Sequence, residues 1–177
     1  AVGQCLHRRR EHRIGLPRVD HDTLRVPRRR ELDRVGHHGG DDLGPQPVAA
    51  ETREFAPGLK LDFYRAVGRP VAPCVIVIHG GGWDSGDREQ FAGFNHWLAR
   101  LGYAVAAIDY RLAPKFIWPA QREDTLAAMA YVKAHAAELG LDATRLVLLG
   151  RSAGGQIASA VGYGTDDAAI RGVVSLY

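Results

Sequence analysis

Apolar and polar positions form blocks with two different periods from about residue 49 onward. Continuous runs rich in Val, Ile and Leu are typical of buried strands. Four such runs occur: Cys74–Ile78, Ala104–Ile108, Leu146–Leu149 and Gly172–Leu176. Segments with helical spacing separate them: Arg88–Leu101, Pro119–Gly140 and Ala153–Val161. This order predicts an α/β protein with a doubly wound, mostly parallel sheet and right-handed crossovers.

Some segments carry more detailed expectations. Leu59–Tyr64 alternates apolar and polar residues, which is typical of an exposed or edge strand. Pro119 suits a first helical turn, and Gly102 and Gly140 follow predicted helix ends. The predicted apolar face of the first helix comprises Phe91, Phe94, Trp97, Leu98 and Leu101. That of the second comprises Thr125, Ala128, Met129, Val132, Ala136 and Leu139.

Residues 1–48 have a different composition from residues 49–177. They contain ten arginines and seven acidic residues, a net charge of +3, whereas residues 49–177 carry thirteen charges of each sign. The first segment has five of the eight histidines and no aromatic residue. Such a segment buries too little apolar surface to offset its ordering entropy. We therefore expect residues 1–48 to be disordered, or to be a non-native Arg/His-rich segment, and residues 49–177 to form the folded domain.

The Arg/His-rich segment suggests two functions that its composition argues against. Arg8–Arg10 and Arg28–Arg30 could form a nucleic-acid-binding arm, but acids are interleaved and no aromatic side chain is present to stack on bases. Cys5 with His7, His12, His37 and His38 could suggest zinc, but the paired Cys/His spacing of zinc sites is missing. We expect no nucleic-acid partner, no metal and no cofactor.

Other features limit where and how the protein works. No apolar run reaches the ~18–20 residues of a membrane-spanning helix, and no signal peptide opens the chain, which favours a cytoplasmic location. Cys5 and Cys74 are too few for a disulfide framework. The chain begins at Ala1 and ends within a predicted strand at Tyr177, so we expect it to be a fragment of a longer protein.

The segment Gly150–Gly155 is a G-x-S-x-G motif placed between a predicted buried strand and a predicted helix. A sharp strand-to-helix turn places its middle residue in a strained conformation, and the residues two before and two after must be very small. Gly150 and Gly154 meet that requirement. The Ser152 hydroxyl would then stand at the sheet edge beside the helix N-terminus, where free N–H groups favour an oxyanion. The alternative is a glycine-rich turn with an incidental serine.

The segment His79–Trp83 places three consecutive glycines directly after a predicted strand. Glycines let the backbone approach a substrate closely and direct N–H groups toward it. Lipases and esterases complete their oxyanion hole with such a segment. A phosphate-binding loop is the alternative, but no G-K-[ST] sequence follows.

Residues 58–177 resemble α/β-hydrolases of the esterase/lipase group. The resemblance rests on four segments: His79–Trp83, Ser85–Arg88, Asp109–Pro114 and Gly150–Gly155. The set is similar to hormone-sensitive-lipase-like esterases, and Trp83 after the glycines fits the feruloyl-esterase-like and kynurenine-formamidase-like branch. The resemblance implies that the chain is the N-terminal part of an incomplete α/β-hydrolase fold.

The resemblance also implies roles for individual residues. Ser152 would be the nucleophile, and the N–H groups of Gly81, Gly82 and Ala153 would form the oxyanion hole. Structural support would come from His79, Gly150 and Gly154. Arg111 and Asp124 would be scaffold residues rather than catalysts.

The catalytic triad of this fold follows the order Ser, acid, His. No histidine follows Ser152, and Asp166 and Asp167 follow it too closely, so the triad acid and histidine are expected beyond Tyr177. The predicted function is hydrolysis of small-molecule carboxylic esters through an acyl-enzyme, with this chain nearly inert by itself. The alternatives are an arylformamidase or serine peptidase of the same fold, and a non-catalytic binding module.

Overall fold

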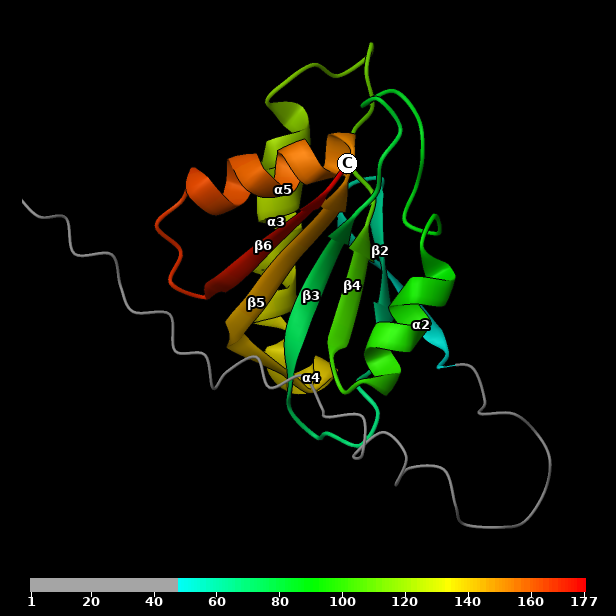
Figure 1. Cartoon of the computed structure of the whole chain (residues 1–177), viewed down its shortest axis with the longest axis vertical. Coiled ribbons are helices and arrows are strands. Elements are labelled where there is room, and N and C mark those ends of the chain that lie inside the picture. Colours follow the sequence, from blue (N-terminus) through cyan, green and yellow to red (C-terminus); the bar gives the residue numbers. More distant parts are fainter. Residues whose placement is uncertain (1–47) are drawn as a thin grey trace, which may run out of the picture. The chain divides into compact units, whose positions relative to one another are not determined.

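The computed structural model describes residues 48–177, which form one six-stranded sheet with helices on both faces (Figure 1). The strands are β1 (Ala50–Ala56), β2 (Leu59–Tyr64), β3 (Ala72–Ile78), β4 (Ala104–Ile108), β5 (Leu141–Arg151) and β6 (Ile170–Leu176). The helices are α2 (Ala92–Arg100), α3 (Ala120–Ala134), α4 (Ala136–Leu139) and α5 (Ala153–Tyr163). The expectations for residues 1–47, including the zinc and nucleic-acid alternatives, lie outside the described residues.

The sheet is mostly parallel, as predicted. The strand order is β1-β2-β4-β3-β5-β6. The pairs β3–β4, β3–β5 and β5–β6 are parallel, whereas β1–β2 and β2–β4 are antiparallel. After β3 the chain moves to β4 on one side, and after β5 it moves to β6 on the opposite side. The carboxyl ends of β3 and β5 therefore flank the point where the connections diverge, which is where open α/β sheets bind ligands.

Side-chain alternation along β3 explains the two layers of helices. Cys74, Ile76 and Ile78 belong to a core cluster that contains Met129 of α3 and Ile157 of α5. The intervening Val75 and Val77 belong to a second cluster with Leu98 and Ala99 of α2. A strand that is apolar on both faces must be covered on both. The doubly wound architecture is thus confirmed, with α3 and α5 on one face and α2 on the other.

The prediction of an exposed or edge strand at β2 was wrong. β2 lies inside the sheet between β1 and β4, and Leu61 and Phe63 are fully buried. The strand that takes the edge is β1, whose sequence, Ala-Glu-Thr-Arg-Glu-Phe-Ala, lacks the β-branched runs of the others. Its charged side chains suit an edge position. Because β1 has no apolar run, its hydrophobicity pattern did not indicate it.

The first predicted helix is shorter than expected, and its predicted apolar face is only partly buried. α2 begins at Ala92 rather than Arg88. Phe94 and Trp97 are 37% and 53% exposed, and the buried residues of α2 are Asn95, Leu98 and Ala99. Leu98 of the predicted face is buried but Phe94 and Trp97 are not, so the apolar spacing located the inward face only in part.

The long second helix is interrupted. α3 ends at Ala134, and a short α4 follows from Ala136. At the break, the backbone N–H of His135 donates to the Tyr131 carbonyl at 3.1 Å, and its ring Nδ1 lies 2.8 Å from that same oxygen. Gly140 ends α4 in the left-handed conformation, at φ 67°. Within residues 48–177 no helix has the length and apolar character needed to cross a bilayer.

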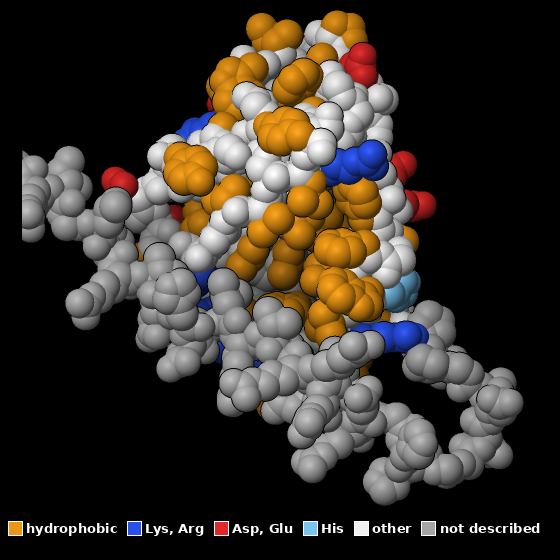
Figure 2. Space-filling model, viewed as in Figure 1, with side chains coloured by type: hydrophobic (Ala, Val, Ile, Leu, Met, Phe, Trp, Pro, Cys, Tyr) orange, Lys and Arg blue, Asp and Glu red, His pale blue; other side chains and the backbone are white. Residues whose placement is uncertain are grey.

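The strand β6 forms the second edge of the described sheet and is not the buried strand that its composition predicted. Val174 and Leu176 are 39% and 46% exposed. Figure 2 shows hydrophobic side chains gathered over this face of the sheet. Phe91, Phe94, Leu149 and Leu176 line a shallow apolar depression there.

The interior position of β2 leads to a stability prediction. We expect Leu61→Ala to lower the free energy of unfolding by about 2–5 kcal/mol, because it opens a cavity in the core. The neighbouring Lys60→Ala, at an exposed position of the same strand, should change it by less than about 0.5 kcal/mol. Urea unfolding of both variants measures this, and equal small effects would contradict the interior placement.

Candidate active site

The two glycine-rich motifs meet at the carboxyl ends of β3 and β5. The parallel register pairs Ile78 with Gly150, so His79–Trp83 and the turn after β5 start at the same level of the sheet. A Cβ atom added to Gly80 would lie 2.9 Å from the Arg151 carbonyl oxygen and 3.5 Å from Ser152 Cβ. The structure therefore brings together two motifs that are about 70 residues apart in the sequence.

Ser152 is the single residue between β5 and α5. Its backbone has φ 52° and ψ −120°, a conformation that residues with a Cβ rarely adopt. Its N–H donates to the Leu176 carbonyl at 2.7 Å, which fastens the turn to β6. The Ser152 residue is exposed, and no side chain or backbone group of residues 48–177 hydrogen-bonds to its Oγ. The hydroxyl is therefore available to a ligand.

The glycines around Ser152 are required by close backbone contacts. A Cβ atom on Gly150 would lie 2.0 Å from the Gly154 carbonyl oxygen. A Cβ atom on Gly154 would lie 2.2 Å from the Ile78 carbonyl oxygen and 2.4 Å from that of His79. Because neither glycine has a Cβ, the first turn of α5 can lie directly against the end of β3. Ala153 is buried and is the first residue of α5. The N–H groups of the first helical turn have no acceptor within the helix, and that of Ala153 is one of them.

The glycine loop adopts conformations that other residues disfavour. Gly81 and Gly82 have φ values of 123° and 59°. The Gly80 N–H donates to Gln90 Oε1 at 2.9 Å. The N–H groups of Gly81 and Gly82 have no acceptor within the part of the chain that the structure describes. Two backbone donors thus remain free beside the Ser152 turn.

His79 lies beneath the glycine loop. Its ring is buried, stacks on Tyr110 at a centroid distance of 4.1 Å, and places Nδ1 2.8 Å from the Gly80 carbonyl oxygen. Because a carbonyl only accepts, Nδ1 carries the proton of the neutral ring. Burial lowers the pKa of His79 below its ordinary value. A neutral, engaged ring of this kind supports the loop.

Arg88 anchors the far end of the glycine loop to the sheet. Its backbone N–H and its Nη1 donate to Asp109 at 3.0 and 3.1 Å, and its Nε donates to Asp62 Oδ1 at 3.0 Å. Asp62 lies on β2 and Asp109 directly follows β4. This arrangement also explains why α2 does not begin at Arg88, since that residue is held by the sheet.

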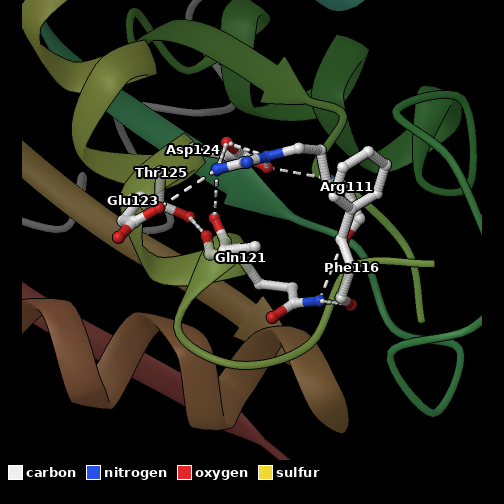
Figure 3. A network of polar contacts seen from close by, with 7 residues as sticks. Arg111, Phe116, Gln121, Glu123, Asp124 and Thr125 are labelled. Atoms are coloured by element: carbon white, nitrogen blue, oxygen red, sulfur yellow. Dashed lines mark hydrogen bonds and ion pairs between the residues drawn. The ribbon is translucent and has the colours of Figure 1, made fainter. Parts of the chain in front are cut away.

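Arg111 and Asp124 form the centre of a polar network that joins the loop between β4 and α3 to the first turn of α3 (Figure 3). Arg111 Nε donates to both Asp124 carboxylate oxygens at 2.8 and 2.9 Å, and the Arg111 backbone N–H donates to Asp124 at 2.8 Å. The Gln121 amide donates to the carbonyls of Arg111 and Phe116 at 2.9 and 3.0 Å. The loop between β4 and α3 is thereby folded onto the first turn of α3.

This loop, Trp83 of the glycine loop and Gln156 of α5 line an open, mainly apolar pocket. It has a volume of about 310 Å³ and is lined by Trp83, Ala113, Ile117, Trp118, Gln121 and Gln156. Trp83 Nε1 donates to Gln156 Oε1 at 3.1 Å, and the Ala113 N–H donates to the Trp83 carbonyl at 2.9 Å. Trp83 itself has φ 67°. These contacts join the glycine loop, the β4–α3 loop and α5.

Sequence reasoning did not identify several of these residues. Gln90, Gln121 and Gln156 were missed because a glutamine in a helical or loop pattern carries no signal of its partner. The exposed apolar pair Ile117 and Trp118 beside Pro119 was a signal that could have indicated a ligand-facing loop. Of the described histidines, none hydrogen-bonds to Ser152: His96 lies on α2 against Tyr64, and His135 lies at the end of α3.

Residues 48–177 contain no group of three or more His, Cys, Asp or Glu side chains that could hold a metal ion. Cys74 is fully buried in β3, and burial raises the pKa of its thiol to about 12. A thiol in that state is a poor nucleophile. Unlike Cys74, Ser152 is exposed, and its hydroxyl has no hydrogen-bond partner among residues 48–177.

The chain matches proteins of known class. The BD-FAE family model matches residues 61–176. Carboxylesterase NlhH of Mycobacterium tuberculosis is 38% identical over 99 residues, which are 55% of this chain and 31% of the relative. The propionate-bound structure of esterase Est2 from Thermogutta terrifontis has a TM-score of 0.60 and 31% identity, covering 66% of this chain and 46% of that chain. Its sarin-phosphonylated form has a TM-score of 0.60 and 30% identity, covering 66% and 45%.

The lengths of these proteins differ from that of this chain. The chain covers 20% and 31% of the first two curated relatives, and less than half of the Thermogutta esterase.

The close contact of α5 with β3 predicts different effects for two glycine substitutions. We expect Gly154→Ala to lower the free energy of unfolding by about 3 kcal/mol, because the new methyl group would overlap two backbone carbonyls. Gly93→Ala, on α2 with open space around it, should be neutral or stabilising by up to about 1 kcal/mol. Urea unfolding of the pair measures the difference. A tolerated Gly154→Ala would show that the turn can relax away from β3.

The neutral state of His79 predicts a pH dependence of stability. Its pKa is lowered on folding, so below about pH 6.5 the unfolded chain binds a proton that the folded chain does not. His79 therefore lowers the free energy of unfolding as pH falls, by at most about 1.4 kcal/mol per pH unit. We expect His79→Asn to lose this part of the decline between pH 7.5 and 5.5, measured by urea unfolding at both values. An unchanged pH dependence would mean that His79 does not contribute.

Proposed function

Because the chain belongs to the BD-FAE family of α/β-hydrolase-fold esterases, we propose that it carries the nucleophile and the oxyanion hole of a serine esterase that hydrolyses small carboxylic esters. The observation that carries the proposal is the placement of exposed Ser152 at φ 52° beside the free N–H groups of Gly81 and Gly82. A strained residue at a ligand-facing turn is a sign of function.

In the proposed reaction, Ser152 Oγ attacks the acyl carbon and loses its proton to a general base. The N–H groups of Gly81, Gly82 and Ala153 stabilise the negative oxygen of the tetrahedral intermediate. The alcohol then leaves with a proton from the base, and water hydrolyses the acyl-enzyme to release the carboxylic acid. His79, Gly150 and Gly154 act as structural support.

The general base is proposed to lie outside this chain. The ring of His79 is engaged with the Gly80 carbonyl, and no histidine follows Ser152 in the sequence. In this fold the acid and then the histidine follow the nucleophile. We therefore place both after Tyr177 in the complete polypeptide.

The pocket that reaches Gln156, one turn after Ser152 on α5, supports short-chain or aryl esters as substrates. Its lining is mainly apolar and includes the two indole rings of Trp83 and Trp118. The Thermogutta esterase, with 31% identity, has been solved with propionate bound. A short acyl group or an aromatic alcohol would bury its apolar surface in such a pocket.

The central test is Ser152→Ala in the complete protein. We expect about a 10⁴–10⁶-fold loss of turnover of an aryl acetate, because the acyl-enzyme can no longer form. Mass spectrometry should find an organophosphonate adduct on Ser152 of the unsubstituted protein. Ser159→Ala, which removes an α5 hydroxyl bonded to the Gly155 carbonyl, is the matched control and should stay active.

Two outcomes would contradict the proposal. Full activity of Ser152→Ala would remove the nucleophile assignment. A large Ser152-dependent rate from the 177-residue chain alone would place the base within it and refute the external histidine. An aryl formamide and a peptide ester assayed in parallel distinguish the arylformamidase and peptidase alternatives from a carboxylesterase.

A further inference from the structure

The Gly81 carbonyl receives an unusual number of hydrogen bonds. The backbone N–H groups of Asp84 and Ser85 donate to it at 3.1 and 3.0 Å, and Ser85 Oγ donates to it at 2.8 Å. Ser85 is exposed, so its hydroxyl could bond to water at little cost. Instead, the hydroxyl donates to the Gly81 carbonyl. All three donors belong to the turn that follows the glycines.

The hydrogen bonds to the Gly81 carbonyl also fix the direction of the Gly82 N–H. The Gly81 carbonyl and the Gly82 N–H belong to the same peptide group, which is trans, since the cis bonds of the described chain precede Pro114 and Pro119. In a trans peptide the C=O and the N–H point in opposite directions. A carbonyl directed into the Ser85 turn therefore directs the Gly82 N–H away from the turn, and that N–H has no acceptor among the described residues.

We propose that Ser85 is a positioning residue of the oxyanion hole, whose hydroxyl holds the Gly81–Gly82 peptide so that the Gly82 N–H faces the acyl oxygen. This inference rests on the proposed esterase function. It assigns to Ser85 a role that acts through the peptide and involves no contact with substrate.

Glycine peptides rotate easily, so the Ser85 hydroxyl adds to the two backbone donors that hold this peptide. Gly81 and Gly82 both have positive φ values, and neither has a Cβ to oppose a flip of the peptide between them. A flipped peptide would present the carbonyl to the oxyanion, which would repel it. The Ser85 hydroxyl favours one of the two orientations before the substrate arrives, and such preorganisation is the basis of oxyanion stabilisation.

The preceding peptide is held by the same device. The Gly80 carbonyl accepts from His79 Nδ1, so the Gly81 N–H points away from that ring. One side chain from before the glycines and one from after them thus orient the two N–H groups. The two fixed peptides are consecutive, which lets their N–H groups act on one oxygen.

The experiment compares Ser85→Ala, Ser85→Thr and Ser159→Ala in the complete protein with an aryl acetate. We expect Ser85→Ala to lower kcat about 3- to 10-fold with KM changed less than about twofold, as for loss of one hydrogen bond felt mainly in the transition state. Ser85→Thr keeps the hydroxyl at an exposed site and should restore kcat to within about twofold. Ser159→Ala loses a comparable hydroxyl-to-carbonyl bond elsewhere and should leave kcat unchanged.

A second measurement separates positioning from general loop stability. A trifluoromethyl ketone forms a tetrahedral adduct that needs the oxyanion hole, so its inhibition constant should rise in Ser85→Ala by the same factor as kcat/KM falls. The inhibition constant of the product carboxylic acid should not change. If Ser85→Ala does not fold, Ser85→Cys, a weak donor, replaces it and should show the same pattern more weakly.

The outcomes are distinguishable. An unchanged kcat in Ser85→Ala, a rise in KM alone, or failure of Ser85→Thr to restore kcat would overturn the role of Ser85. If Ser152→Ala is inactive while Ser85→Ala is fully active, only this inference fails. If Ser152→Ala stays active, the proposed function itself fails.

Discussion

The site depends on how closely the first turn of α5 approaches the end of β3. Backbone lies directly against backbone there, because Gly150 and Gly154 leave no Cβ between the strands and the helix. That contact pushes Ser152 into its positive-φ conformation, exposes its hydroxyl and places the free N–H groups of the helix start beside the glycine loop. With larger residues at these positions the helix would move outward, and the two halves of the site would separate.

Paired charges hold the loops that surround this contact. Arg88 links the end of the glycine loop to Asp62 and Asp109, and Arg111 links the β4–α3 loop to Asp124. The carboxylates of Asp62 and Asp124 are almost fully buried, so losing either arginine would leave a buried charge without its partner. These ion pairs hold the loops that carry the free backbone donors and the pocket walls.

The orientation of single peptide groups is the finest level of this arrangement. Three glycines in succession provide flexibility and close approach, and this freedom must be limited for the N–H groups to act as a preorganised donor set. His79 and the turn at Ser85 limit it from the two sides of the loop through carbonyls of the same peptides. The loop therefore consists of flexible glycine residues whose peptide groups are held by hydrogen bonds.

The sequence by itself determined the features that follow from local sterics and periodicity. The runs of β3, β4 and β5, the alternation with helices, the glycines that Ser152 requires and the α/β class were all predicted, because each depends on neighbours within about ten residues. Only the tertiary structure decided the others. β2 became an interior strand through the backbone pairing of β1, α2 turned Asn95 inward and Phe94 outward, and Arg88 bonded to Asp62 of β2 instead of starting a helix. The direction of the Gly82 N–H depends on the Gly81–Ser85 turn, which is local in sequence, but the hydrogen bonds of this turn leave no apolar period from which they could be predicted.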